Sequence, residues 1–203
     1  MNTRSLSSIL AITGALLAQH NAHAQCADLV GHWAFESDTL DSSGVNNNGN
    51  PVGAVSYVAG VSGQAVYFDG TSRVVVPNSA SLNPANQISI SAWYRPVPFS
   101  GSGNDGIVDK GASSHSPPYY QYHLGVSGTQ YSIPGTMGFN LMGAGGAGTG
   151  TNFYTVGPWY HMVGTYDGTT ARLYVNGVLV NENPFTQTLT NFGRPLVIGG
   201  FSN

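Results

Sequence analysis

Residues 159–182 read WYHMVGTYDGTTARLYVNGVLVNE and contain two turn dipeptides, Asp167-Gly168 and Asn176-Gly177. Glycine and asparagine tolerate positive φ angles, so these dipeptides favour the tight turns of β-hairpins. The stretch therefore predicts a three-stranded antiparallel meander. Side chains alternate along its first strand, which puts bulky apolar groups on both faces. One face holds Trp159, His161, Val163 and Thr165, and the other holds Tyr160, Met162, Gly164 and Tyr166.

The rest of the chain repeats this pattern of short β-like runs separated by turn signals, which is typical of a sandwich or barrel. No stretch keeps a 3.6-residue apolar period, so we expect no long helix. The clearest runs are LVGHWAFE (29–36), QAVYFDG (64–70), RVVVP (73–77), ISISAWYRP (88–96), YYQYHLGV (119–126), TMGFNLM (136–142) and PLVIGG (195–200).

The composition agrees with a folded, turn-rich domain. Charged residues make up 7% of the 203 residues and aromatic residues 11%, and there are 28 glycines. A disordered chain would be more charged and poorer in aromatics. The formal net charge is −3 and Lys110 is the only lysine. A nucleic-acid partner is excluded because no basic surface can form.

The N-terminus has the three parts of a secretory signal peptide. MNTR is positively charged, LSSILAITGALLA is apolar, and Ala22-His23-Ala24 is a small-x-small cleavage signal. The sequence predicts a signal peptide over 1–24, a domain over 25–203, and a secreted, extracellular or periplasmic protein. The apolar run is too short for a transmembrane segment. Cys26, the only cysteine, is either a free thiol or forms a disulfide bond with a cysteine outside this sequence.

Six segments, taken in order over residues 29–200, resemble the laminin G-like jelly-roll domains of the concanavalin A-like lectin/glucanase group. They are GHWAFE, DSSGVNNNG, GVSGQAVYFDGTSRVVVP, ISISAWYRP, WYHMVGTYDGTTARLYVNG and LVIGG. The resemblance implies an all-β, two-sheet antiparallel jelly-roll sandwich. Such domains occur in exported proteins, attached to enzymes or in adhesive and carbohydrate-binding roles.

The chain departs from the family pattern in two places. Residues 97–158 match only loosely. Relatives usually continue past the IGG segment with a strand of the form IDEVRIY beside the N-terminal strand, whereas this sequence stops at Asn203. We therefore expect a truncated product or fragment, with an unpaired edge on the strand at 29–36.

The loop DSSGVNNNGNP (41–51) has two interpretations. Calcium prefers carboxylate, amide and carbonyl oxygens, and the resemblance implies one structural calcium held by Asp41, with Asn46, Asn48 and Glu36 as further ligands. The loop lacks the spacing of an EF-hand. Alternatively, it is a turn whose Asn and Asp side chains bond their own backbone. Both interpretations stay open at this point.

The segment SPPYYQYHLG (116–125) is the clearest binding candidate. Strand alternation predicts Tyr120 and Tyr122 on one face, with Tyr119 and His123 on the other. Tyrosine rings suit sugar rings and protein contacts. We expect one pair to fill the core and the other to line a concave groove. The predicted carbohydrate-binding residues are Tyr120, Tyr122, Trp93 and Asn140.

Catalytic patterns are absent from the sequence. Glu36 and Glu182 are the only glutamates, and neither lies in the E-x-D-x-x-E pattern of related glucanases. GAGGAG (143–148) opens no helix of a dinucleotide-binding unit. We predict a secreted, non-catalytic module that binds carbohydrate or a glycoprotein. The alternatives are a protein-interaction or structural domain of a cell-surface assembly, and a polysaccharide hydrolase or lyase. The sequence leaves the oligomeric state open.

Overall fold

The computed structural model describes residues 28–97, 105–111, 118–127, 135–143, 146–148 and 154–201. The predicted signal peptide and Cys26 lie outside these ranges. The described residues form thirteen strands and one short 3-10 helix, η1 (Ala80–Leu82). No helix in these ranges is long and apolar enough to cross a membrane. The predicted all-β class is confirmed.

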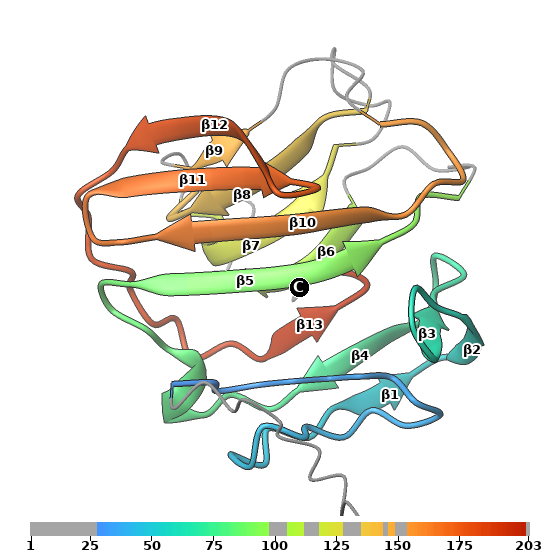
Figure 1. Cartoon of the computed structure of the whole chain (residues 1–203). Coiled ribbons are helices and arrows are strands. Elements are labelled where there is room, and N and C mark those ends of the chain that lie inside the picture. Colours follow the sequence, from blue (N-terminus) through green and yellow to red (C-terminus); the bar gives the residue numbers. More distant parts are fainter. Residues whose placement is uncertain are drawn as a thin grey trace, which may run out of the picture.

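The strands form two packed sheets and a hairpin, all antiparallel (Figure 1). The larger sheet has the order β1 (Asn50–Val52), β4 (Arg73–Val76), β13 (Leu196–Ile198), β6 (Asp105–Gly111), β7 (Tyr120–Val126), β8 (Met137–Leu141) and β9 (Ala147–Gly148). The smaller sheet has the order β12 (Val178–Pro184), β11 (Thr170–Val175), β10 (Tyr160–Tyr166) and β5 (Ile88–Tyr94). The hairpin consists of β2 (Ser56–Ala59) and β3 (Gln64–Tyr67). The order and packing are those of a concanavalin A-like jelly roll.

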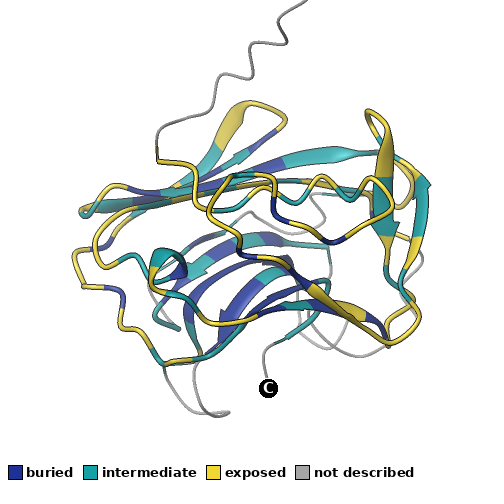
Figure 2. Cartoon of the chain, turned by 90° about the horizontal axis from the view of Figure 1, so that it is seen from below, coloured by how far each residue is buried: buried dark blue, intermediate teal, exposed yellow. Residues whose placement is uncertain are grey.

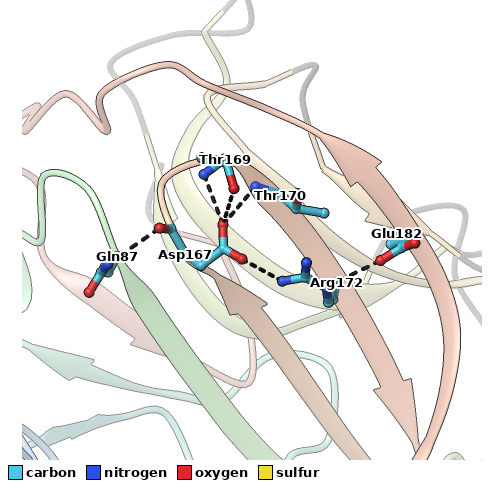
Figure 3. A network of polar contacts seen from close by, with 6 residues as sticks. All are labelled: Gln87, Asp167, Thr169, Thr170, Arg172 and Glu182. Carbon is cyan, nitrogen blue, oxygen red and sulfur yellow. Dashed lines mark hydrogen bonds and ion pairs between the residues drawn. The ribbon is translucent and has the colours of Figure 1, made fainter.

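The predicted meander is confirmed as β10–β11–β12. Gly168, Asn176 and Gly177 have φ angles of 95°, 51° and 79°, as tight turns require. Figure 3 shows how Asp167 holds the first turn: its carboxylate accepts hydrogen bonds from Thr169, Thr170 and Arg172. Arg172 also binds a carboxylate of β12, so one charge network joins the turn to the neighbouring strand.

The core lies between the sheets, and register shows which side chains face it. One cross-strand row of the larger sheet is almost completely buried: Val74, Ile198, Val108, Leu124, Phe139 and Ala147. Phe139 packs on β10 at Gly164, where an added Cβ would lie 2.4 Å from the aromatic ring. Most of the buried residues, dark blue in Figure 2, lie on strands, whereas the N-terminal loops are largely exposed.

The neighbouring row of the larger sheet points away from the core, because successive side chains alternate between faces. Its members are Asn50, Val75, Val197, Asp109, His123 and Asn140. We call this side of the larger sheet its outer face. It carries the polar and aromatic groups described below.

The prediction of a strand at 29–36 was wrong. Only Trp33 forms a β-bridge there, to Asp41. Phe35 and Ser37 adopt φ angles of 58° and 65°, which interrupt an extended strand. The segment instead packs against the core through Trp33 and Phe35.

Candidate functional site

A β-bulge sets the direction of the predicted binding residues on β7. Lys110 pairs with Tyr122, but the next residue of β6, Gly111, pairs with Tyr120. Gln121 is therefore an extra residue, and the simple alternation assumed from the sequence fails at this point. Tyr120 consequently shares a face with His123, and the prediction that it shares one with Tyr122 was wrong.

The ring of His123 lies between two other rings on the outer face. Its centroid is 4.6 Å from that of Tyr120 and 5.6 Å from that of Phe201, and both pairs are stacked. His123 Nδ1 also lies 3.1 Å from a carboxylate oxygen of Asp109, and both side chains are buried. Two stacked rings and one carboxylate therefore hold His123 in place, and His123 in turn packs against the half-buried ring of Tyr120.

Asn140 lies beside the same histidine, directly opposite it on β8. The next outward-facing row consists of glycines: Gly106, Gly125, Gly138 and Gly148. An added Cβ at Gly138 would meet only the Asn140 amide, at 3.2 Å, and one at Gly148 would meet nothing closer than 3.9 Å. Among the described residues, the outer face of β8 and β9 at Gly138 and Gly148 is therefore backbone next to an amide. We call Tyr120, His123, Gly138, Asn140 and Gly148 the Tyr120–Asn140 site.

The other two predicted sugar-binding residues lie elsewhere. Tyr122 belongs to the core, with 3% of its surface exposed and its hydroxyl donating to the Leu82 carbonyl at 3.0 Å. Burial raises the pKa of this hydroxyl, and the charge of Asp109 raises it further. Trp93 is 53% exposed but lies on β5, in the smaller sheet. Of the four predicted residues, only Tyr120 and Asn140 come together.

The loop at 41–51 is closed by its own hydrogen bonds. Asp41 Oδ1 accepts from the amides of His32 and Ser43, and Oδ2 accepts from the Ser43 hydroxyl and the Asn47 amide. Asn48 Oδ1 accepts from the amide of Asp41. Burial acts to raise the pKa of Asp41, but these hydrogen bonds outweigh it and lower the pKa below its ordinary value. This is the self-bonded turn that the sequence left open.

The predicted calcium ligands do not form a ready ligand set. The four accepted bonds occupy the lone-pair positions of Asp41 that a cation would need. Glu36 accepts from the amide of Gln64, the first residue of β3. Asn46 and Asn48 line a polar cavity of about 310 Å³. In the described ranges, no three His, Cys, Asp or Glu side chains gather to hold a metal. Calcium binding stays a prediction that the geometry does not favour.

Lys110 lies on the core side of the larger sheet with 1% of its surface exposed. Its ammonium donates to Asn78 Oδ1 at 2.7 Å and to the carbonyl of Arg194 at 2.5 Å. Burial lowers the pKa of Lys110 to about 8. This amine is enclosed by the protein and is not part of the outer face.

Comparison with known proteins agrees with this architecture. The sequence profile described as the concanavalin A-like lectin/glucanases superfamily matches residues 68–203, which is more than half of the chain. The chain belongs to this superfamily. No curated protein has a sequence that matches significantly.

Three solved structures share the superfamily's fold with this chain. Domain 4 of AbnA, an extracellular arabinanase of Geobacillus stearothermophilus solved with arabinotriose, has a TM-score of 0.63 and 19% identity, over 85% of this chain and 84% of that one. The binding domain of Paraclostridial Mosquitocidal Protein 1 has a TM-score of 0.59 and 15% identity, over 79% of this chain and 41% of that one. The binding domain of botulinum neurotoxin serotype C1 has a TM-score of 0.57 and 14% identity, over 84% of this chain and 42% of that one. This superfamily member thus spans less than half of each toxin domain.

The pairing of Asp109 with His123 was not predicted, since the two residues lie fourteen positions apart in the chain. Aligning 105–111 with 120–126 as neighbouring antiparallel strands would have placed them opposite each other. The missing signal was strand pairing, which neither residue reveals alone.

Proposed function

We propose that this chain is an exported, non-catalytic carbohydrate-binding module that takes a sugar ring at the Tyr120–Asn140 site. Export rests on the signal-peptide pattern of residues 1–24. The related domain 4 of AbnA was solved with arabinotriose, and cell entry of botulinum neurotoxin type C, which has a similar fold, depends on interaction with two ganglioside molecules. Both support a sugar ligand for this chain.

One observation carries the proposal: no described side chain other than that of Asn140 closely covers the outer face at Gly138 and Gly148. A flat ring can approach such a surface closely. The amide offers two donors and an acceptor for sugar hydroxyls. Tyr120, held against His123, adds an aromatic ring with a polar tip on the other side of the histidine.

The carboxylates support a binding role without catalysis. Glycoside hydrolysis generally needs two carboxyl groups flanking the sugar bond. Among the described side chains of β6, β7, β8 and β9, Asp109 is the only carboxylate, and it is 1% exposed and bound to His123. Glu182 pairs with Arg172 on the smaller sheet.

A glycan-array screen of residues 25–203, followed by calorimetry, tests the proposal. We expect Tyr120→Ala and Asn140→Ala each to weaken binding of the best glycan at least tenfold, the equivalent of about 1.4 kcal/mol. Tyr67→Ala is the matched control, because Tyr67 is an exposed tyrosine on the β2–β3 hairpin. Equal affinity of all three variants and the wild type would refute the site.

A further inference from the structure

The outer face of the smaller sheet carries a second group of planar side chains. Trp93 of β5 lies opposite His161 of β10. Their rings stack with centroids 4.9 Å apart and an angle of 27° between planes. His161 Nε2 lies 2.8 Å from the hydroxyl of Ser91, so the histidine is held in place beneath the indole. The Trp93 ring is supported yet 53% exposed.

A guanidinium group lies next to this ring. Arg95 follows Trp93 by two positions, one residue past the end of β5, and both side chains are exposed. Its Cζ atom is 5.3 Å from the ring centroid of Trp159, a cation–π contact that holds the guanidinium near the sheet. Within the described ranges, the guanidinium makes no ion pair. We call Trp93, Arg95, Trp159 and His161 the Trp93 face.

Among the described side chains, no carboxylate neutralises the charge of Arg95. Arg95 is exposed, and within the described ranges no carboxylate forms an ion pair with it. By contrast, Arg172 on the same sheet is bound by Asp167 at 2.6 Å and by Glu182 at 3.2 Å (Figure 3). Arg95 therefore supplies one unpaired positive charge beside an exposed aromatic ring.

From this arrangement we infer that the Trp93 face is a second saccharide site, selective for acidic sugars such as uronic or sialic acids. The C–H face of the sugar ring stacks on Trp93, and its carboxylate binds Arg95. Arginine suits this role because its donors match a carboxylate in a bidentate fashion. A single free cation fits one carboxylate and does not suit a polyanion such as nucleic acid.

The inference goes beyond the site proposed above and uses the opposite sheet, so each can fail alone. The test is calorimetry of residues 25–203 with trigalacturonic acid and sialyllactose, and with galactotriose and lactose as uncharged counterparts. We expect at least one acidic ligand to bind, its uncharged counterpart to bind at least tenfold more weakly, and affinity to fall with added salt.

The variants assign the site. Arg95→Gln is expected to weaken acidic-sugar binding tenfold to a hundredfold, because the carboxylate loses its charge-assisted hydrogen bonds. Trp93→Ala is expected to abolish it. Arg73→Gln is the control, because Arg73 is an exposed arginine of β4 in the other sheet. Arg95 and Trp93 are both exposed, so we expect the variants to fold, and a thermal melt checks this.

Three results would overturn the inference. One is that neither acidic ligand binds the wild type. Another is that Arg95→Gln and Arg73→Gln have the same effect. The last is that acidic-sugar binding survives Trp93→Ala but is lost in Tyr120→Ala, which would place the acidic ligand at the Tyr120–Asn140 site and support that proposal instead.

Discussion

Replacing Gly164 by alanine should destabilise the protein, because Gly164 lies on the inner side of β10 under the ring of Phe139. The new Cβ would lie 2.4 Å from two ring carbons. Ordinary carbon–carbon contacts are about 3.5–4.0 Å, so the ring would have to move by roughly 1 Å. Phe139 is completely buried, and protein cores are close-packed, so a shift of the ring is costly.

Overpacking of this kind typically costs about 1–3 kcal/mol. Alanine in place of a strand glycine returns about 0.5–1 kcal/mol through reduced backbone entropy. We therefore expect Gly164→Ala to lower the free energy of unfolding by about 1–2 kcal/mol. In a chain of this size each kcal/mol lowers Tm by about 2–4 °C. Urea denaturation followed by circular dichroism measures the change.

Gly138→Ala is the matched control on the other side of the larger sheet. Its Cβ would meet only the end of the Asn140 side chain, at 3.2 Å, and the amide can shift. We expect its free energy of unfolding to stay unchanged or rise by up to about 1 kcal/mol. If Gly164→Ala were as stable as Gly138→Ala, the assignment of inner and outer faces would be wrong, and the proposed site with it.

Three further predictions concern charged groups. Asp41→Ala should lower the free energy of unfolding by about 1–3 kcal/mol, because three backbone amides lose their acceptor. Calcium chloride should leave the wild-type Tm unchanged, and a rise in Tm would contradict the self-bonded loop. The folded pKa of Lys110, about 8, lies below the ordinary 10.5, so the unfolded state binds more protons as pH rises between these values. Wild-type stability relative to Lys110→Met should therefore rise over that range in urea titrations, and a flat difference would refute the burial of the amine. Hydrogen bonds, the strongest from Arg172 and the next from Thr169, lower the pKa of Asp167. The ionised Asp167 therefore stabilises the fold above pH 3.8, and this stabilisation is lost as pH falls through the lowered pKa. The Tm difference between wild type and Asp167→Asn should shrink on acidification, and a constant difference would argue against the network.

The sequence predicts most of the fold because its local signals agree with the tertiary structure. Asp167-Gly168 and Asn176-Gly177 both mark real turns, and alternation along β10 correctly separates buried Met162 from outward-facing His161. Strands β1, β2, β6 and β9 were not predicted. β1 and β9 have three residues or fewer, so neither carries a readable alternation. β6 reads DGIVDKG, and its terminal glycines and charged residues hide the strand.

The candidate site could be predicted only in part. Tyr120 and Asn140 were chosen as polar or aromatic residues on strands, and both lie on the outer face. Tyr122 was assigned to the wrong face because one extra residue at the bulge reverses the alternation, and nothing in YYQYHLGV marks it. Trp93 was expected in the same groove, but the sheet that a strand joins depends on pairing between distant segments.

The most direct test of the central claim is a glycan-array screen of the wild type and Gly138→Val, read together with their thermal melts. Valine fits a β-strand well and would fill the bare surface beside Asn140. We expect the variant to keep the wild-type Tm and to lose the glycans bound at this face. A variant that binds the same glycans as strongly as the wild type, or a wild type that binds none, would contradict it.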